Sequence, residues 1–136
     1  MKIVMVIDRE LPMGLIANTA AVLGISLGKL FPDEIVGRDI QDADGNVHVG
    51  ITTKTIPLLA GTKDQIKGIR EAIGAGGDPA VTVIDFSEIA QKCRDYESYV
   101  DILTCYTASR LAYLGICLYG PEKKINKLTG SLGLLR

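Results

Sequence analysis

The sequence lacks most of the residues that identify an activity directly. Its 136 residues include no tryptophan, one histidine (His48), and three cysteines (Cys93, Cys105 and Cys117). There is no CxxC pair and no second histidine, so the usual zinc-ligand spacings are absent. An odd number of widely spaced cysteines does not build a disulfide framework. We therefore expect reduced thiols, a cytoplasmic location, no metal site and no cofactor.

An excess of charge of either sign is also missing. Fifteen basic side chains face sixteen acidic ones, which gives a formal net charge of −1. Proteins that bind nucleic acid usually carry a clustered excess of Lys and Arg to neutralise phosphates. The charge balance therefore argues against tRNA as a partner and leaves an unknown small molecule or protein as the expected one.

No segment is expected to enter a membrane. The apolar run at the N-terminus ends at Asp8, and no small-residue cleavage pattern follows it. Residues 13–31 are apolar over a longer stretch, but Asn18, Ser26 and Lys29 interrupt them, which favours a buried helix. A hydrophobic content of 47% over this length fits one globular domain covering residues 1–136.

Strand and helix patterns alternate along most of the chain. This alternation predicts a three-layer α/β/α sandwich with a mixed, mostly parallel sheet. The first strand is apolar at every position and is expected inside the sheet. Strands are predicted at residues 2–7, 35–40, 46–51, 56–60, 81–85 and 111–119, and helices at residues 13–31, 62–73, 87–93, 96–107 and 122–128.

The first helix is apolar nearly all round. Ile16, Leu23 and Leu27 follow one stripe, but Leu15 and Ile25 lie on the opposite side. A helix with apolar residues on more than one side is covered on more than one side. This surplus, together with the apolar C-terminal tail 130–135, predicts a homodimer.

Two groups of polar residues are candidates for a site. Asp85 ends the apolar strand 81–85, where α/β folds place ligands, although an aspartate there also marks an ordinary turn. Asn18 and Thr19 could offer an amide and a hydroxyl to the same cleft, or could bond nearby backbone. Tyr96 and Tyr99 could form its stacking wall, or could pack helix against sheet.

Other potentially reactive groups give weaker signals. His48 lies among alternating apolar residues of a strand, where an imidazole is more often a surface or packing residue. Cys117 falls inside an apolar strand and is expected to be inert. Cys105 and Cys117 remain alternatives as nucleophiles, although no Cys–His pair is recognisable.

Both ends of the chain resemble the type II peptidyl-tRNA hydrolases. An apolar strand, residues 2–8, leads through Leu11-Pro-Met-Gly14 into a helix. Near the other end, a strand closing in Gly120-Pro121 leads into a helix closed by Thr129-Gly130. The resemblance implies that family's α/β fold, and it places Asp85 at the position of an active-site aspartate.

The resemblance does not extend to that family's chemistry. The positions that hold its lysine, glutamine and histidine carry Ala17, Ala21 and Gly24, none of which can move a proton. The hairpin around residues 42–46 and the insertion 93–110 are closer to a bacterial family of unknown function, the domain-of-unknown-function family numbered two thousand. We therefore expect a small-ligand or partner-binding module. The alternative is a hydrolase of an ester or amide that uses divergent residues around Asp85.

Overall fold

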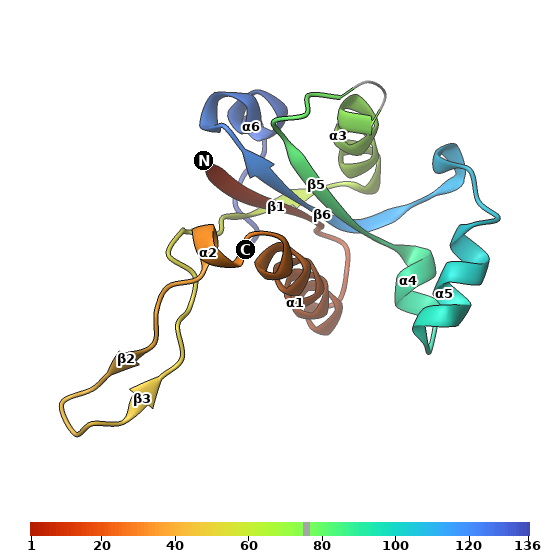
Figure 1. The fold of residues 1–136 in the computed structure, drawn as a ribbon. Helices are drawn as coiled ribbons and strands as arrows, with labels where there is room; N and C mark the ends of the chain where they lie inside the picture. The colour runs from red at the N-terminus through yellow and green to blue at the C-terminus, as the bar shows by residue number, and fades with distance from the viewer. Residues whose placement is uncertain (75–76) are drawn as a thin grey trace.

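The computed structural model describes residues 1–74 and 77–136 (Figure 1). The main sheet contains β1 (Lys2–Asp8), β4 (Leu58–Gly61), β5 (Thr82–Ser87) and β6 (Tyr113–Gly120), and a separate hairpin contains β2 (Ile40–Gln41) and β3 (Val47–His48). The helices are α1 (Met13–Leu30), α2 (Pro32–Ile35), α3 (Lys63–Gly74), α4 (Glu88–Lys92), α5 (Tyr96–Leu103) and α6 (Glu122–Thr129), with a 3₁₀ turn at Ala108–Arg110.

The sheet has the strand order β4-β1-β6-β5 and is mixed. β1 and β4 are parallel, whereas β6 runs antiparallel to both of its neighbours, β1 and β5. The prediction of a mostly parallel sheet is therefore wrong, because only one of its three strand pairs is parallel. The alternation of strands and helices agrees with the common direction of β1, β4 and β5, because connections that contain helices join β1 to β4 and β4 to β5. It could not show that β6 enters between β1 and β5 in the opposite direction.

Helices cover both faces of the sheet. α1 packs on one face, and α3 and α6 pack on the other (Figure 1). β1 contributes side chains to the hydrophobic core on each face of the sheet, because its successive side chains point to opposite faces. Ile3 and Met5 join the core under α1, while Val4 and Val6 join the core under α3 and α6. The expected position of the first strand inside the sheet, with the first helix packed on it, is confirmed.

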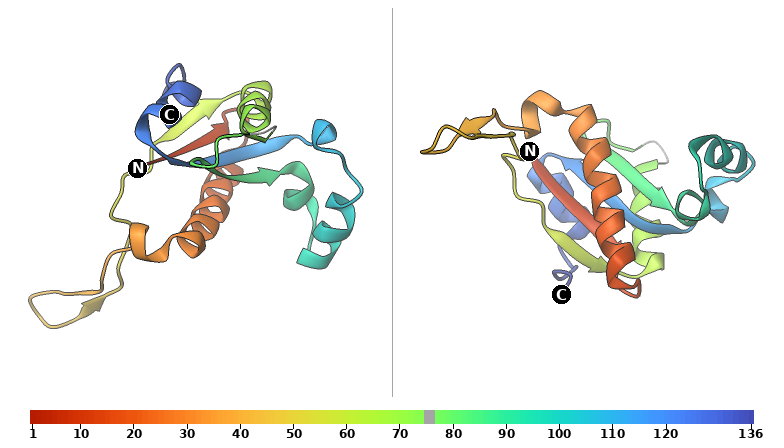
Figure 2. Two further views of the ribbon diagram at one scale, coloured as in Figure 1. Left: turned by 45° about the horizontal axis from the view of Figure 1, so that its top comes forward. Right: turned by 90° about the horizontal axis from the view of Figure 1, so that it is seen from below.

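The long connection between β5 and β6 leaves and re-enters the sheet at the same end. Ser87 and Tyr113 are register partners, so residues 88–112 form an excursion that contains α4 and α5. Ser87 caps α4 by accepting a hydrogen bond from the backbone N–H of Ala90, as an N-terminal serine commonly does. Because the chain returns to its starting point, β6 must reverse direction relative to β5. Figure 2 shows this excursion projecting beyond the sheet.

A second projection, which we call the arm, comprises residues 37–52 and contains β2 and β3. Gly45 turns it with a φ of 85°, a left-handed conformation that favours glycine. The two strands are much shorter than expected, since only two register pairs connect them. No other element covers the arm in the part of the chain that is described, and it extends away from the sheet (Figure 1).

The C-terminal tail pairs with β4 at the edge of the sheet. The backbone N–H of Ala60 donates to the carbonyl of Gly133 at 2.9 Å, and that of Leu135 donates to the carbonyl of Leu58 at 2.8 Å. The tail therefore satisfies backbone groups that an edge strand would otherwise leave open. Pro57 lies just before β4, which is at the edge of the four-stranded sheet, where a proline is tolerated.

Candidate functional site

The carboxyl ends of three strands meet at one end of the sheet. β1, β4 and β5 share a direction, so Asp8, Gly61 and Ser87 all lie at this edge. Ligands of open α/β sheets bind in this region. The excursion begins here, and two hollows flank its helix α4. Both hollows include Cys93 in their lining.

The first hollow, which we call the tyrosine pocket, lies between α1, the end of β5 and the start of α5. It has a volume of about 360 Å³. This falls in the usual range for small-molecule sites, about 300–1,000 Å³. Its lining combines an apolar floor with an aromatic and charged rim: Val22, Ser26, Asp85, Phe86, Ala90, Cys93, Arg94, Asp95, Tyr96 and Tyr99.

Asp85 takes part in an ion pair at this pocket. Its Oδ2 accepts a hydrogen bond from Nε of Arg70, on α3, at 2.8 Å. Both side chains are less than one third exposed, so the pair is partly shielded from water. The carboxylate is already compensated by a guanidinium. This contact was not foreseen, because Arg70 is fifteen residues away along the chain.

The two tyrosines of the rim are packed against each other. The rings of Tyr96 and Tyr99 meet edge to face, with their centroids 5.5 Å apart. Burial raises the pKa of the Tyr99 hydroxyl, and the negative charge of Asp85 adds to this shift. Tyr96 remains largely exposed at the mouth. The pair presents an aromatic surface to the pocket, and Tyr99 keeps its proton well into the alkaline range.

The charged residues beside the tyrosines differ in their partners. Asp95 caps α5, with Oδ1 accepting a hydrogen bond from the backbone N–H of Ser98 at 2.8 Å. Asp85 is paired with Arg70. Arg94 has no carboxylate within ion-pair distance in the described part of the chain. Asp95 also has no cation within ion-pair distance among the described residues, so Arg94 and Asp95 leave one unpaired charge of each sign in the lining.

Asn18 and Thr19 do not line the tyrosine pocket. Asn18 is exposed on α1, and Thr19 is fully buried beneath it. The Thr19 hydroxyl donates to the carbonyl of Leu15, four residues earlier in the same helix, at 2.7 Å. Of the five residues proposed from the sequence for the ligand cleft, the structure brings together Asp85, Tyr96 and Tyr99. α1 instead contributes Val22 and Ser26 to the lining of the tyrosine pocket.

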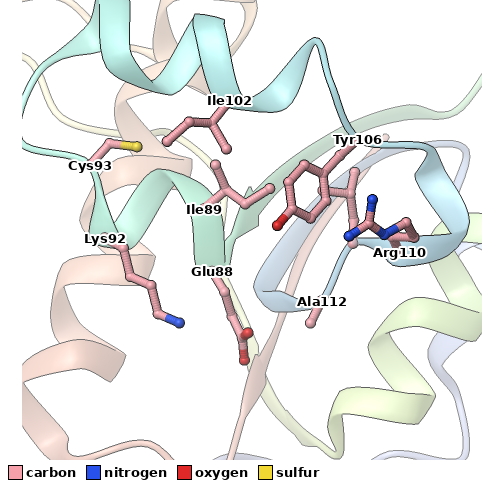
Figure 3. A pocket seen from close by; sticks show the side chains of 9 residues that line it. Glu88, Ile89, Lys92, Cys93, Ile102, Tyr106, Arg110 and Ala112 are labelled. Carbon is pink, nitrogen blue, oxygen red and sulfur yellow. The ribbon is translucent and has the colours of Figure 1, made fainter.

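The second hollow lies on the other side of α4, within the excursion (Figure 3). Its volume is about 520 Å³. The guanidinium carbon of Arg110 lies 4.5 Å from the ring centroid of Tyr106, a cation–π contact. Glu88 accepts a hydrogen bond from Nζ of Lys63 at 2.5 Å, which lowers the pKa of Glu88. The remaining lining is Ile89, Lys92, Cys93, Ile102, Leu111 and Ala112.

Asp8 is a buried acid that the sequence reasoning did not select. It is 1% exposed, and its Oδ1 accepts a hydrogen bond from the backbone N–H of Glu10 at 3.0 Å. Its Oδ2 has no hydrogen-bond partner among the described residues. Asp8 also contributes to the raised pKa of Lys63, after the larger effect of Glu88. The signal that singled out Asp85, an aspartate closing an apolar strand, was equally present at residues 2–8.

The remaining titratable candidates lie apart from both hollows. His48 is on the arm, where its Nε2 lies 2.8 Å from Oδ2 of Asp42. Cys117 is buried in β6, and burial raises the pKa of its thiol to about 12. Cys105 is exposed near the end of α5. Across the described residues, no group of three or more His, Cys, Asp or Glu side chains is arranged to hold a metal ion.

These environments predict a clear order of thiol reactivity. Because the thiolate is the reactive form, Cys117 should not react with a thiol reagent at pH 8 in the native protein, while exposed Cys105 should react first. Absorbance-monitored labelling with a disulfide reagent measures this, and Cys105→Ser should remove the fastest phase. A fast phase that disappears in Cys117→Ser instead would contradict the assignment.

The fold and hollows define a mixed α/β sandwich with ligand-sized pockets at the carboxyl edge of its sheet. The chain belongs to a protein family of unknown function, DUF2000, whose model matches residues 1–136. A solved structure of a protein of unknown function, Atu0240 of Agrobacterium tumefaciens strain C58, is similar in fold. The TM-score is 0.86 at 18% identity, over 98% of this chain and 96% of that one. A comparison with curated proteins returns no match.

Proposed function

We propose that this protein is a binding module for a small organic anion, and that the ligand occupies the tyrosine pocket. The observation that carries the proposal is that Arg94, the one cation of the lining, has no carboxylate partner in the described chain. Asp85 is paired with Arg70, and both carboxylate oxygens of Asp95 accept hydrogen bonds from Ser98. A carboxylate or phosphate on the ligand would supply that partner through charge-assisted hydrogen bonds.

The lining also indicates what the rest of the ligand looks like. Phe86, Val22 and Ala90 give an apolar floor, and Tyr96 and Tyr99 give aromatic edges and faces. Such surroundings favour a planar or apolar body, because aromatic side chains contribute both buried area and stacking. The ligand class is therefore an aromatic or otherwise apolar molecule that carries one anionic group.

The proposed scaffold is that of the type II peptidyl-tRNA hydrolases. Support comes from the path of the chain: β1 leads through Pro12 into α1, and β6 ends at Gly120, before α6. A binding role is proposed over ester or amide hydrolysis because Ala17 and Ala21 supply no acid or base to α1. Asp85, the acid on which the hydrolase alternative rests, is held by Arg70.

The test is a thermal-shift screen of small aromatic carboxylates and phosphates against the wild type and Arg94→Gln. A ligand present at 100 times its Kd should stabilise the wild type by about 2.7 kcal/mol, roughly an 8 °C rise in Tm. Losing a charge-assisted hydrogen bond should weaken affinity about 10- to 100-fold in Arg94→Gln. Arg136→Gln, at the chain terminus, is the matched control and should bind normally.

Two results would overturn the proposal. One is a panel in which no anion stabilises the wild type while neutral or cationic compounds do. The other is an anion that stabilises Arg94→Gln as strongly as the wild type. Tyr99→Phe refines the test, because it keeps the ring and removes the hydroxyl. Binding retained in Tyr99→Phe but lost in Tyr99→Ala would support stacking on the ring.

A further inference from the structure

The outer face of α1 is largely apolar and exposed. Lys29 is the helix's only charged residue, and Met13 and Ile25 are 85% and 76% exposed. By length and composition, α1 could even cross a membrane, although its inner residues Leu23 and Leu27 are buried against the sheet. A helix at the surface of a monomer normally presents charged and polar residues to water. This face therefore lacks the character of a solvated surface.

The arm is the second uncovered apolar surface. Val47 lies in β3, and Val49 and Ile51 follow at alternate positions in the same half of the arm. They are 61%, 77% and 79% exposed. A two-stranded hairpin alone is marginally stable in water, and this one has only two register pairs. The arm therefore presents an apolar surface on which a partner could pack.

The accessible surface of the chain can be compared with that of a compact monomer of the same mass. The chain exposes 8607 Å². A compact monomer of 14.6 kDa is expected to expose about 6,900 Å², so the excess is about 1,700 Å². A standard interface buries about 800 Å² on each partner, and obligate dimers bury more. The arm and the excursion both contribute to this excess, which is larger than the area that one partner buries in a standard interface.

We infer that α1 and the arm form the interface of a two-fold homodimer, in which the arm of each subunit lies over α1 of the other. Figures 1 and 2 place the arm and α1 on the same side of the sheet, so one symmetry operation can cover both. Two apolar surfaces on one chain complement each other in an isologous dimer without a different partner. The excursion lies at the opposite end of the molecule from the arm (Figure 1), and the tyrosine pocket adjoins the interface at Val22 and Ser26 of α1.

Light scattering coupled to gel filtration at micromolar concentration tests this inference. The wild type should have twice the mass of the chain. Ile25→Lys and Val49→Lys should each shift it to the monomer, because each places a charge in an apolar interface. Val100→Lys, on α5 and away from both surfaces, is the matched control and should remain dimeric. Circular dichroism with a cooperative thermal transition shows whether each variant is folded.

The same experiment distinguishes the other possible occupants of this surface. A wild type that elutes as a monomer, or as an assembly larger than a dimer, would overturn the inference. So would co-sedimentation of a monomeric wild type with phosphatidylcholine–phosphatidylglycerol vesicles, because α1 would then face lipid. If Ile25→Lys fails to fold, Val49→Lys decides the matter, since the arm lies outside both hydrophobic cores.

Discussion

Phe86→Ala is expected to lower the free energy of unfolding by about 3–5 kcal/mol. Phe86 is 8% exposed and belongs to the core between α1 and the sheet, together with Leu23 and Leu27. Alanine would remove most of the side chain and leave a cavity beneath the tyrosine pocket. Urea unfolding followed by circular dichroism, at one protein concentration, measures the change.

Tyr96→Ala is the matched control for Phe86→Ala. Tyr96 lines the same pocket but is 74% exposed, so its truncation should cost no more than about 1 kcal/mol of stability. The same variant should weaken ligand binding, because it removes part of the aromatic rim. A stable Phe86→Ala protein would mean that the floor of the pocket is not part of the core, contrary to this account.

Gly115→Ala is expected to destabilise the protein by about 1–3 kcal/mol through overpacking. A Cβ at this position in β6 would lie 2.7 Å from Cγ2 of Thr19 and 3.2 Å from the carbonyl oxygen of Val6. Thr19 is short and branched at Cβ, so it cannot move aside easily. The added methyl group should therefore push α1 away from the sheet. Urea unfolding measures the loss of stability.

A second substitution isolates the contact with Thr19. Thr19→Ser removes Cγ2 but keeps the hydroxyl that donates to Leu15. The Gly115→Ala/Thr19→Ser protein should recover part of the lost stability, which would appear as non-additivity in a double-mutant cycle. Gly68→Ala, on α3 with nothing near its Cβ, should instead stabilise the protein by about 0.5–1 kcal/mol. Additive losses in the cycle would refute the close approach of α1 to β6.

The sequence was most informative where local chemistry decides the structure. The apolar run of residues 2–7 predicted a strand inside the sheet, and the sequence also predicted a hairpin around residues 42–46 and a helix near residues 87–93. All three are present. The direction of β6 was not predictable in the same way, because it depends on where the excursion returns. The arm's strands were also over-predicted, since an alternating pattern does not say whether two segments pair along their full length.

The candidate site was only partly predictable for a similar reason. Asp85, Tyr96 and Tyr99 were selected from a strand end and from aromatic clustering, and they line one pocket. The ion pair between Arg70 and Asp85 was not predicted, because it forms between α3 and β5 only in the folded chain. Thr19 was considered as a possible ligand contact, yet it is buried under Gly115, where its methyl group fills the space between helix and strand. These relations are tertiary, and a single sequence does not specify them.

Binding of a small organic anion in the tyrosine pocket can be observed by amide chemical-shift mapping with NMR, using the strongest anionic ligand from the thermal-shift screen. We expect the largest shifts in residues 85–90 and 93–99, with smaller ones at Val22 and Ser26 across the pocket. Shifts concentrated on the arm, or around Tyr106 and Arg110 in the second hollow, would contradict it.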